Sequence, residues 1–336
     1  MAFLSLFDAL SVRHLVLKNR IVMPPMVTLM GVTTERARAW YAERAKGGVG
    51  TIIVEAVKVE LFQSGEFEEA LKKLAAAIHA NGATAAIQLF HANVFNGEQV
   101  AASAAGKART VTREEIGQII PRYARAAEMA VRAGFDAVEP HGAHGFFMNQ
   151  FFSPRTNKRD DEYGGSLECR MRFGLDVVKA VRAAIGKAVM FYRHTPEQLG
   201  KAGYSLSDSQ QFAAKLVEAG VDVLDISPST RQGEGQEHAA LAAAIKSVVK
   251  CPVIAVGGME DPKAATAVLQ DGKADLVAVG RQLIADAHWA NKVAADKLGA
   301  VIACKKCNQK CFGHLGKGIP IGCAENPKSG FEYLNE

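Results

Sequence analysis

The sequence predicts an α/β fold, a (β/α)8 TIM barrel in which eight strands alternate with helices. The main observation is a recurring unit, an Ala/Lys/Glu-rich helix followed by a glycine and a short β-branched run, as in RAGFDAVEP (132–140) and EAGVDVLDIS (218–227). Glycine just past a helix supplies the left-handed C-cap, and such an apolar run fits a strand buried on both faces of a parallel sheet. Eight such runs separated by amphipathic stretches favour a barrel. A doubly wound open sheet is the structural alternative.

The expected elements follow in order along the chain. The apolar start MAFLSLFDALSV predicts the first strand of a hairpin and not a signal peptide, because Asp8 interrupts it and it has neither a basic segment nor a cleavage site. A helix is expected over 112–133, opening with a Thr112/Glu115 capping box. The loops after the second and third strands look short, which predicts an open active site. The barrel strands are expected within residues 20–27, 45–56, 83–90, 132–140, 188–193, 218–227, 251–257 and 270–280.

Composition limits the classes of partner. A net charge of +5 suits an anionic cofactor or substrate, but only 7% of the residues are aromatic and no dense Lys/Arg block occurs, which argues against a nucleic-acid partner. No uninterrupted apolar run reaches membrane-spanning length, so no membrane partner is expected. We therefore expect a cytoplasmic, reduced protein, and a homo-oligomer stays open.

Four cysteines at C-x2-C-x3-C-x11-C spacing crowd into the C-terminal stretch. Short intervals let a tight loop aim several thiolates at one centre, as in iron–sulfur and zinc sites. A disulfide set is disfavoured, because such a pattern in a reduced compartment is more often metal-binding or catalytic. Spacing alone leaves iron–sulfur and zinc open. The candidate ligands are Cys304, Cys307, Cys311 and Cys323.

The expected strand ends carry the other candidate site residues. Phosphate commonly binds after the seventh and eighth strands of such barrels, where this sequence reads VGGM (256–259) and VGRQ (279–282). No G-x-G-x-x-G follows the first strand, so the Rossmann fingerprint is absent. His141 and His144 follow the fourth strand; an isolated pair of this kind is typical of surface or capping histidines. The polar run 155–172 predicts a salt-bridged loop that braces the site.

The sequence resembles the old-yellow-enzyme superfamily of FMN-dependent barrels, in the branch of 2,4-dienoyl-CoA reductase, 2-enoate reductase and trimethylamine dehydrogenase. The resemblance covers almost the whole chain. The motifs that carry it are LKNRIVMPPM (17–26), YAERAKGGVG (41–50), HGAHG (141–145), YGGSLE (163–168), RMRF (170–173), VIAVGGM (253–259), DLVAVGRQLIAD (275–286) and the cysteine cluster with its trailing ENP.

The resemblance implies a role for each matching position. Pro25, Met26, Val27 and Ala56 would line the flavin ring of FMN, and Gln88 and Arg193 would bond its polar edge. Gly257, Gly258, Met259, Gly280 and Arg281 would hold the FMN phosphate. His141 and His144 would sit over the flavin and polarise a carbonyl. The cysteine quartet would hold a [4Fe–4S] cluster, which favours iron–sulfur over zinc.

Phe146 departs from the pattern of that family. It stands two residues after the second histidine, where many members have a proton-donating tyrosine. A general acid typically contributes about 10²–10⁴-fold, so another donor is needed, and we rank His238 first among His238, Tyr192, His194 and a bound water. The flavin-tuning position is Val27, with Thr28 next to it, where relatives often have Thr or Cys.

The early end of the sequence also departs from that family. Cluster-bearing relatives usually continue into FAD- and NAD(P)-binding modules, whereas this sequence stops soon after Cys323. We therefore expect two parts, an FMN barrel over 1–300 and a cluster-binding extension over 301–336, with electrons supplied by a separate donor protein or subunit and NAD(P)H as a candidate ultimate donor.

The leading hypothesis is an ene-reductase that transfers hydride from FMN N5 to a C=C bond conjugated to a carbonyl or thioester, with a small-molecule enoate, enone or enoyl-thioester as substrate. Two alternatives stay open. One is an amine or other dehydrogenase that exports electrons through the cluster. The other is a non-catalytic electron-transfer subunit.

Overall fold

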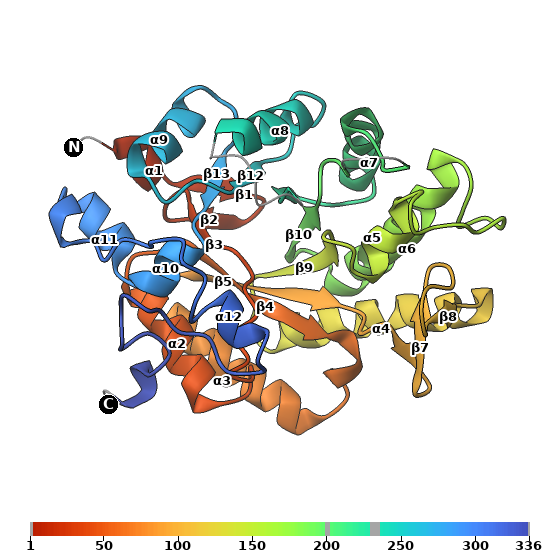
Figure 1. Ribbon diagram of the computed structural model, residues 1–336, viewed down its shortest axis with the longest axis horizontal. Coiled ribbons are helices and arrows are strands. Elements are labelled where there is room, and N and C mark those ends of the chain that lie inside the picture. The colour runs from red at the N-terminus through yellow and green to blue at the C-terminus, as the bar shows by residue number, and fades with distance from the viewer. Residues whose placement is uncertain (1–2, 199–201, 229–235, 335–336) are drawn as a thin grey trace.

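Eight parallel strands close into a barrel (Figure 1). The computed structural model describes residues 3–198, 202–228 and 236–334. The strands pair in chain order, which confirms the predicted fold class and rules out the open sheet. They are β3 (Ile21–Met23), β4 (Thr51–Lys58), β5 (Thr84–Phe90), β9 (Ala137–Gly142), β10 (Val189–His194), β11 (Val223–Ile226), β12 (Val253–Val256) and β13 (Leu276–Ala278).

Helices cover the outside of the barrel, and apolar side chains between strands and helices form the larger core. The predicted capping box is confirmed, since Thr112 Oγ1 accepts from Glu115 N and Glu115 Oε2 accepts from Thr112 N. The helices are α2 (Glu35–Lys46), α3 (Gly65–His79), α4 (Arg113–Arg132), α5 (Phe147–Phe152), α6 (Leu167–Ile185), α7 (Leu206–Glu218), α8 (Gln236–Lys246), α9 (Pro262–Gln270), α10 (Arg281–Ala285) and α11 (Trp289–Ala294), with 3-10 turns η1 (Val59–Leu61) and η2 (Leu298–Ala300).

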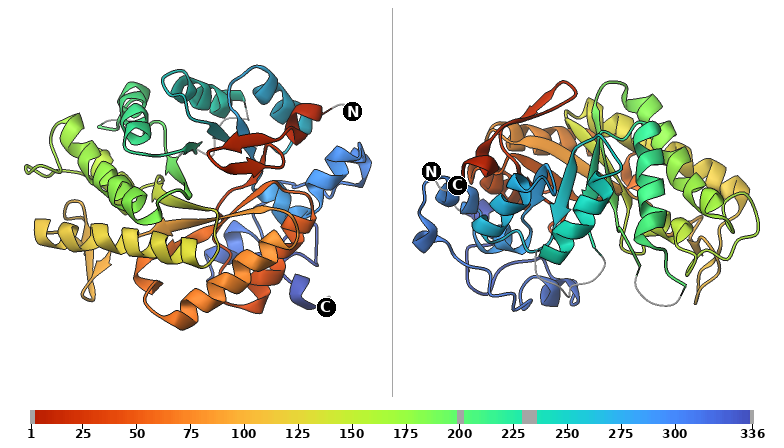
Figure 2. Two further views of the ribbon diagram at one scale, coloured as in Figure 1. Left: turned by 180° about the vertical axis from the view of Figure 1, so that it is seen from behind. Right: turned by 90° about the horizontal axis from the view of Figure 1, so that it is seen from above.

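The N-terminal prediction was correct in part. The hairpin exists, as β1 (Leu10–Val12) and β2 (Leu15–Leu17), but a short helix, α1 (Leu4–Phe7), precedes it where a strand was expected. The hairpin lies at the rear of the barrel, as the view from behind in Figure 2 shows. Val12 and Leu17 pack there with the inward-facing strand residues. The hairpin therefore closes the amino-terminal end of the strands and leaves the other end for the site.

The loop after the third strand is not short, which corrects the sequence-based expectation. Residues between β5 and α4 form a small sheet of β6 (Val94–Phe95), β7 (Glu98–Ala101) and β8 (Arg109–Thr110). Arg159 braces this sheet by donating to the carbonyls of Ala102 and Val111 at 3.0 and 2.6 Å. The polar run 155–172 is therefore salt-bridged, as predicted, but the part that it braces is the small sheet, and bracing of the site itself stays a prediction.

The C-terminal extension crosses the front of the barrel, at the carboxyl ends of the strands (Figures 1 and 2). It contains α12 (Phe312–Leu315) and η3 (Glu332–Leu334). Ile321 N donates to Thr28 O at 2.9 Å, and Glu332 Oε1 lies 2.7 Å from Nη1 of Arg44, which is 1% exposed. The extension is thus tied to the first barrel loop and to α2.

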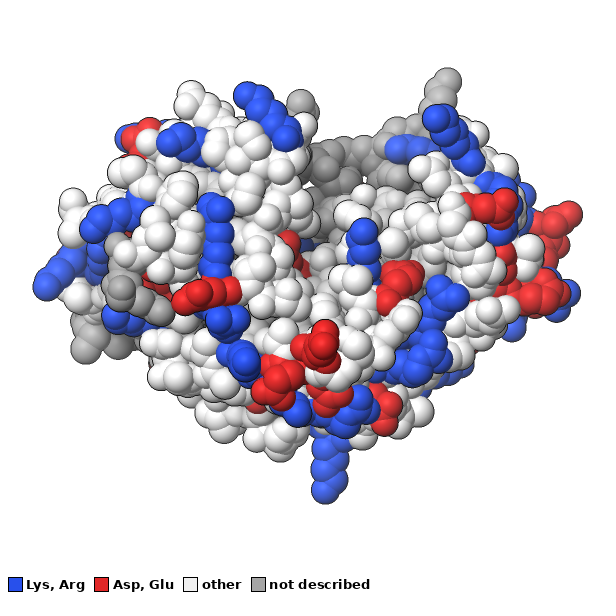
Figure 3. All heavy atoms as spheres, turned by 90° about the horizontal axis from the view of Figure 1, so that it is seen from below, with Lys and Arg blue, Asp and Glu red and all other residues white. Residues whose placement is uncertain are grey.

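Surface charge on one face is mixed, with Lys and Arg interspersed among Asp and Glu (Figure 3). Such a surface lacks the single basic stripe typical of nucleic-acid binding on that face. Within the described part of the chain, no helix combines the length and apolar character that crossing a bilayer requires.

Candidate active site

Two adjoining cavities open at the carboxyl ends of the strands. One has a volume of about 230 Å³ and the other about 280 Å³. Both are lined by Pro25, Met26, Arg193 and Arg281. We name them the phosphate cavity and the ring cavity, after the parts of FMN that the sequence analysis assigns to the residues lining them. Together they form an elongated site whose two ends differ in chemistry.

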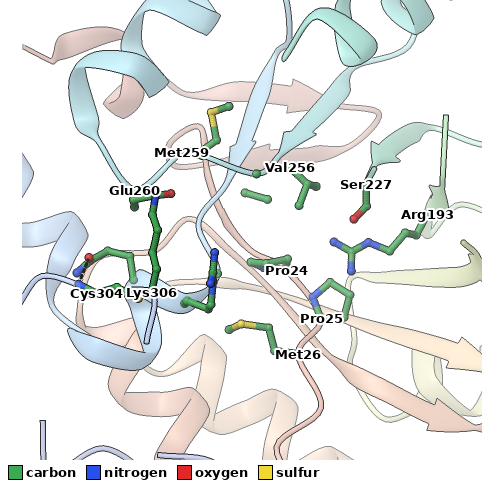
Figure 4. Close-up of a pocket in the computed structure, with 16 residues that line it drawn as sticks. Pro24, Pro25, Met26, Arg193, Ser227, Val256, Met259, Glu260, Cys304 and Lys306 are labelled. Carbon is green, nitrogen blue, oxygen red and sulfur yellow. Dashed lines mark hydrogen bonds and ion pairs between the residues drawn. The ribbon is translucent and has the colours of Figure 1, made fainter. Parts of the chain in front are cut away.

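Glycines and Arg281 define the phosphate cavity. Gly257 and Gly258 have φ of 105° and 73°, which residues with a side chain rarely adopt. A Cβ on Gly257 would lie 2.0 Å from His238 Nδ1, so this position also needs glycine for space. Met259 lines the cavity although its side chain is buried and points away from it (Figure 4). Backbone N–H groups and a guanidinium are the donors that bind a phosphate group.

The loop after β3 supplies the floor shared by the two cavities. The strand ends at Met23, because the next two residues are prolines and cannot donate to a strand ladder. Val27 lines the ring cavity, whereas Thr28 is buried and bonds Glu55 through both its hydroxyl and its backbone N–H. Of the two candidates for the flavin-tuning position, only Val27 thus faces the cavity. A register shift in β4 between Val54 and Val57 accompanies the placement of Ala56 in the same lining.

Gln88 and Arg193 both line the ring cavity, and each is held from behind by a buried carboxyl group. Gln88 Nε2 donates to Glu139 Oε1 at 2.7 Å. Nε of Arg193 lies 2.9 Å from Oδ2 of Asp225, and both side chains are almost fully buried. Strand register explains this cluster, because Gln88 pairs with Glu139 and Arg193 pairs with Asp225 in the barrel.

The two carboxyl groups share one cation. Burial, followed by the charge of Asp225, raises the pKa of Glu139 well above its ordinary value. Burial also raises the pKa of Asp225, although Arg193 opposes that shift. Of the two, Glu139 therefore holds a proton more readily, and Asp225, which pairs with Arg193, balances the guanidinium.

His141 and His144 meet at the wall of the ring cavity, with ring centroids 5.6 Å apart. His144 has φ of 58°, and its backbone N donates to Thr195 Oγ1 at 3.0 Å, so this left-handed turn is fixed by a side chain. Its Nε2 lies 3.0 Å from Ser227 Oγ. His141 is buried, and its Nδ1 has no hydrogen-bond partner among the described residues. Burial therefore excludes the surface interpretation for His141, whereas His144 stays exposed at the wall of the ring cavity.

Both imidazoles are neutral at physiological pH. Desolvation of its ring at the cavity wall, followed by the charge of Arg193, lowers the pKa of His144 to about 4. Burial, then His144 and Arg193, lowers the pKa of His141 well below its ordinary value. The Phe146 ring packs 4.5 Å from His141 and lines the same cavity. Two neutral imidazoles, each with one N–H donor, thus lie beside the Phe146 ring, which has no acidic proton.

The structure does not bring the candidate replacement proton donors to this pair. His238 lies on α8 against Gly257 and, in the described chain, lines neither cavity. Tyr192 and His194 face outward into the helix layer, where both pack against Phe212. Their strand neighbour Arg193 points inward, as alternation along a strand requires. The geometry therefore argues against all three as donors.

The four cysteines of the extension line one small cavity, of about 20 Å³, together with Arg281. This is room for about one water molecule. In the described residues, no three His, Cys, Asp or Glu side chains are already grouped around a metal position. The donor set fits a thiolate-bound cluster, and the cavity between the cysteines would have to widen to admit it.

Four residues of the site had no place in the sequence-based prediction: Glu139, Asp225, Thr195 and Ser227. Glu139 and Asp225 lie within β9 and β11, whereas Thr195 and Ser227 directly follow β10 and β11. The sequence could have pointed to two of them. Glu139 and Asp225 are acidic residues inside apolar runs, where an unpaired charge is costly, so each predicts a buried partner. Thr195 and Ser227 had no such signal.

A (β/α)8 barrel with a glycine- and arginine-lined cavity, a buried arginine and paired histidines at its strand ends is typical of flavin-dependent oxidoreductases. Residues 5–298 match the NADH:flavin oxidoreductase / NADH oxidase family. The chain belongs to this family, which confirms the resemblance drawn from its motifs.

Three similar proteins, two compared by sequence and one by structure, illustrate the relationship. An NADH oxidase of Thermoanaerobacter brockii is 36% identical over 370 residues, which cover 98% of this chain and 57% of that protein. A cinnamate reductase of Clostridium sporogenes is 30% identical over 390 residues, covering 97% and 58%. The structure of 2-naphthoyl-CoA reductase with 2-naphthoyl-CoA aligns with a TM-score of 0.93 at 24% identity, covering 98% and 58%, and so supports the fold. The chain spans a little over half the length of these three proteins.

Proposed function

We propose that this protein is an FMN- and [4Fe–4S]-dependent ene-reductase, acting on a C=C bond conjugated to a carbonyl or thioester. The observation that carries the proposal is the neutral pair His141 and His144, set into an apolar cavity beside Arg193. Negative charge develops on the carbonyl oxygen during such a reduction. Fixed N–H donors aimed at that oxygen stabilise it, and the loss of one such donor typically costs about 10²–10³-fold in rate.

The lining of the two cavities fits FMN from end to end. Gly257, Gly258 and Arg281 would hold its phosphate, and Pro25 would lie along its ring. Arg193 would face the polar edge of the ring and favour an added negative charge there. FMN, when bound, supplies the hydride chemistry, and the chain supplies the binding, the orientation and the charge.

The walls of the ring cavity favour a flat, apolar acyl substrate. Phe146 comes from the barrel, whereas Phe312, Leu315 and Ile321 come from the extension. Aromatic and aliphatic surfaces of this kind bury a conjugated chain or ring and exclude water from the reacting atoms. Cinnamate, the substrate in the name of one relative, has this shape.

Electron supply through the cysteine quartet is the second part of the proposal. Cys311 lines both the cysteine cavity and the ring cavity, so a cluster bound to the quartet would lie next to the substrate site. Electrons would come from a redox donor beyond the barrel. An anaerobic absorption spectrum with iron and sulfide analysis tests this part. Zinc in place of iron would contradict it.

The catalytic part is tested by substitution of the histidine pair. His141→Ala and His144→Ala should each lower turnover of an enoate or enoyl-thioester by about 10²-fold, whereas His141→Asn and His144→Asn, which keep an N–H donor, should retain more. His79→Ala, at a surface ion pair with Asp136, is the control. Equal activity in the Ala and Asn variants would contradict the role of hydrogen-bond donor.

One observation favours a second candidate, dehydrogenation of an amine or similar substrate with export of electrons. Phe146 has no proton to deliver, and an oxidation needs none. Enoates with an artificial electron donor and amines with an artificial acceptor separate the two. Flavin reduction without turnover of either substrate class would favour the third alternative, a non-catalytic electron-transfer subunit.

A further inference from the structure

We propose that Lys306, on the cysteine loop, is a phosphate-binding residue of the flavin site. This inference rests on the proposed FMN site and adds a ligand that comes from outside the barrel. We define the cysteine loop as residues 304–311, which contain the first three cysteines. Lys306 lies between two of them and still lines the phosphate cavity.

The position of Lys306 follows from the backbone of the loop. Lys306 has φ of 53°, a left-handed conformation that a lysine seldom adopts. The side chain runs from the loop toward Glu260, and Nζ lies 2.7 Å from Glu260 Oε1 (Figure 4). In the same view Cys304 lies on this side of the cavity, while Arg193 and Ser227 approach from the opposite side. Lys306 thus stands at the phosphate end.

A phosphate group in the phosphate cavity would need a second cation besides Arg281 to balance its charge. A phosphate monoester carries a charge of about −1.5 to −2 at neutral pH. Among the described lining residues, Arg193 is committed to Asp225 at the ring end, and Glu260 adds a negative charge. Arg281 alone does not balance a phosphate beside that carboxylate. Lys306 supplies the missing charge, and its three N–H donors let it bond phosphate while it keeps Glu260.

The cysteine loop is tied to the phosphate end at two further points. Arg281 Nη1 donates to Asn308 Oδ1 at 3.0 Å, and Cys304 N donates to Gln282 Oε1 at 2.9 Å. The residues that face the phosphate therefore depend on the shape of the loop that carries the thiols. Ordering of the loop should strengthen phosphate binding through Lys306.

The competing explanation for the position of Lys306 is structural: its ion pair with Glu260 only holds the cysteine loop to the barrel. Their side chains are 49% and 30% exposed, and ion pairs of this kind contribute little to stability. The two explanations differ in one respect. Lys306→Met and Glu260→Gln both break the ion pair, but only Lys306→Met removes a cation from the phosphate.

The experiment measures the dissociation constants of FMN and riboflavin for flavin-depleted full-length protein, by quenching of flavin fluorescence. The ratio isolates the phosphate contribution. Lys306→Met should lower the preference for FMN roughly 3- to 10-fold, the range of a partly exposed charge-assisted contact. Riboflavin affinity should stay the same. Lys305→Met is the matched control, because Lys305 lines the cysteine cavity and not the phosphate cavity.

Glu260→Gln should keep or raise the FMN preference, because it removes a repulsive charge. Equal losses in Lys306→Met and Glu260→Gln would overturn the inference in favour of the structural explanation, and so would an unchanged preference in Lys306→Met. A wild-type protein that binds FMN no better than riboflavin would overturn the phosphate site as a whole, and with it the proposed function.

Discussion

At the scale of single residues, Phe146 is the position that best separates the proposed reduction from the alternative oxidation. Its ring packs on His141 and lines the ring cavity, so a hydroxyl on this ring would sit beside the substrate. Phe146→Tyr should raise the rate of C=C reduction about 10-fold or more, because proton donation typically contributes about 10²–10⁴-fold. Amine oxidation should not improve. Single-turnover reoxidation of the reduced enzyme by an enoate measures the effect.

Phe90→Tyr is the matched control for that prediction. Phe90 lies edge-on to Phe146, with ring centroids 5.6 Å apart, but does not line the cavity. A hydroxyl there should leave the rate unchanged. Equal gains in both variants would mean that the added hydroxyl acts through general polarity and not as a positioned acid.

Single residues also show what could be predicted from the sequence. His141 and His144 were found because a motif carries them, and their neutral state needed the structure, since burial and Arg193 cause it. His238 was proposed from its place after the sixth strand. Chain order gives the loop in which a residue lies but not the direction of its side chain, and the ring turns to Gly257 instead.

At the scale of elements, four adjacent strand ends act together. β5, β9, β10 and β11 place Gln88, Glu139, Arg193 and Asp225 in one buried row. Because Asp225 balances Arg193, Asp225→Asn should leave an uncompensated positive charge beside the flavin edge. The midpoint potential of bound FMN should therefore rise by tens of millivolts, since positive charge favours the reduced, anionic form.

Glu139→Gln is the comparison that identifies the charged member of the row. Burial and the charge of Asp225 raise the pKa of Glu139 and favour its neutral form, so a neutral amide of the same shape should leave the potential nearly unchanged. Spectroelectrochemical titration of both variants at one pH measures the difference. A larger shift in Glu139→Gln than in Asp225→Asn would reverse the assignment of the proton.

The sequence predicted the existence of the barrel strands more reliably than the residues at which they end. Each barrel strand overlaps its expected run, because burial on both faces produces a continuous apolar signal, but β4, β9 and β10 extend one or two residues past the expected ends. The run 20–27 was expected as one strand, yet β3 stops at Met23 and the following loop lines the site. The small sheet β6 to β8 was missed, since strands of two to four residues leave no periodicity to detect.

At the scale of the whole molecule, the extension completes a site that the barrel leaves open. It adds Phe312, Leu315 and Ile321 to the ring cavity, and it is anchored by the Glu332–Arg44 ion pair. The spacing of its cysteines suggested a metal site. Its contribution to the substrate wall could not be inferred from spacing, because that depends on how the chain folds back across the barrel.

Buried neutral histidines make the stability of the whole fold sensitive to acid. His194 is 1% exposed, its Nε2 lies 2.8 Å from Ser209 Oγ, and burial lowers its pKa to about 3. The unfolded chain binds a proton at this residue near pH 6.5, whereas the folded chain does not, so stability falls as pH drops below about 6.5. Between pH 7 and pH 5 this one residue should cost about 2 kcal/mol of unfolding free energy.

The variant His194→Gln isolates that contribution, because Gln can keep a bond to Ser209 and does not titrate. Urea denaturation at pH 7 and pH 5 should show a smaller acid loss in His194→Gln than in wild type, by about 2 kcal/mol. The opposite contribution of Glu139, whose raised pKa favours the folded state in acid, is present in both proteins and cancels. His14→Gln, at an exposed position in the hairpin turn, should change nothing. An acid loss that is the same in wild type and His194→Gln would mean that His194 is protonated in the folded barrel.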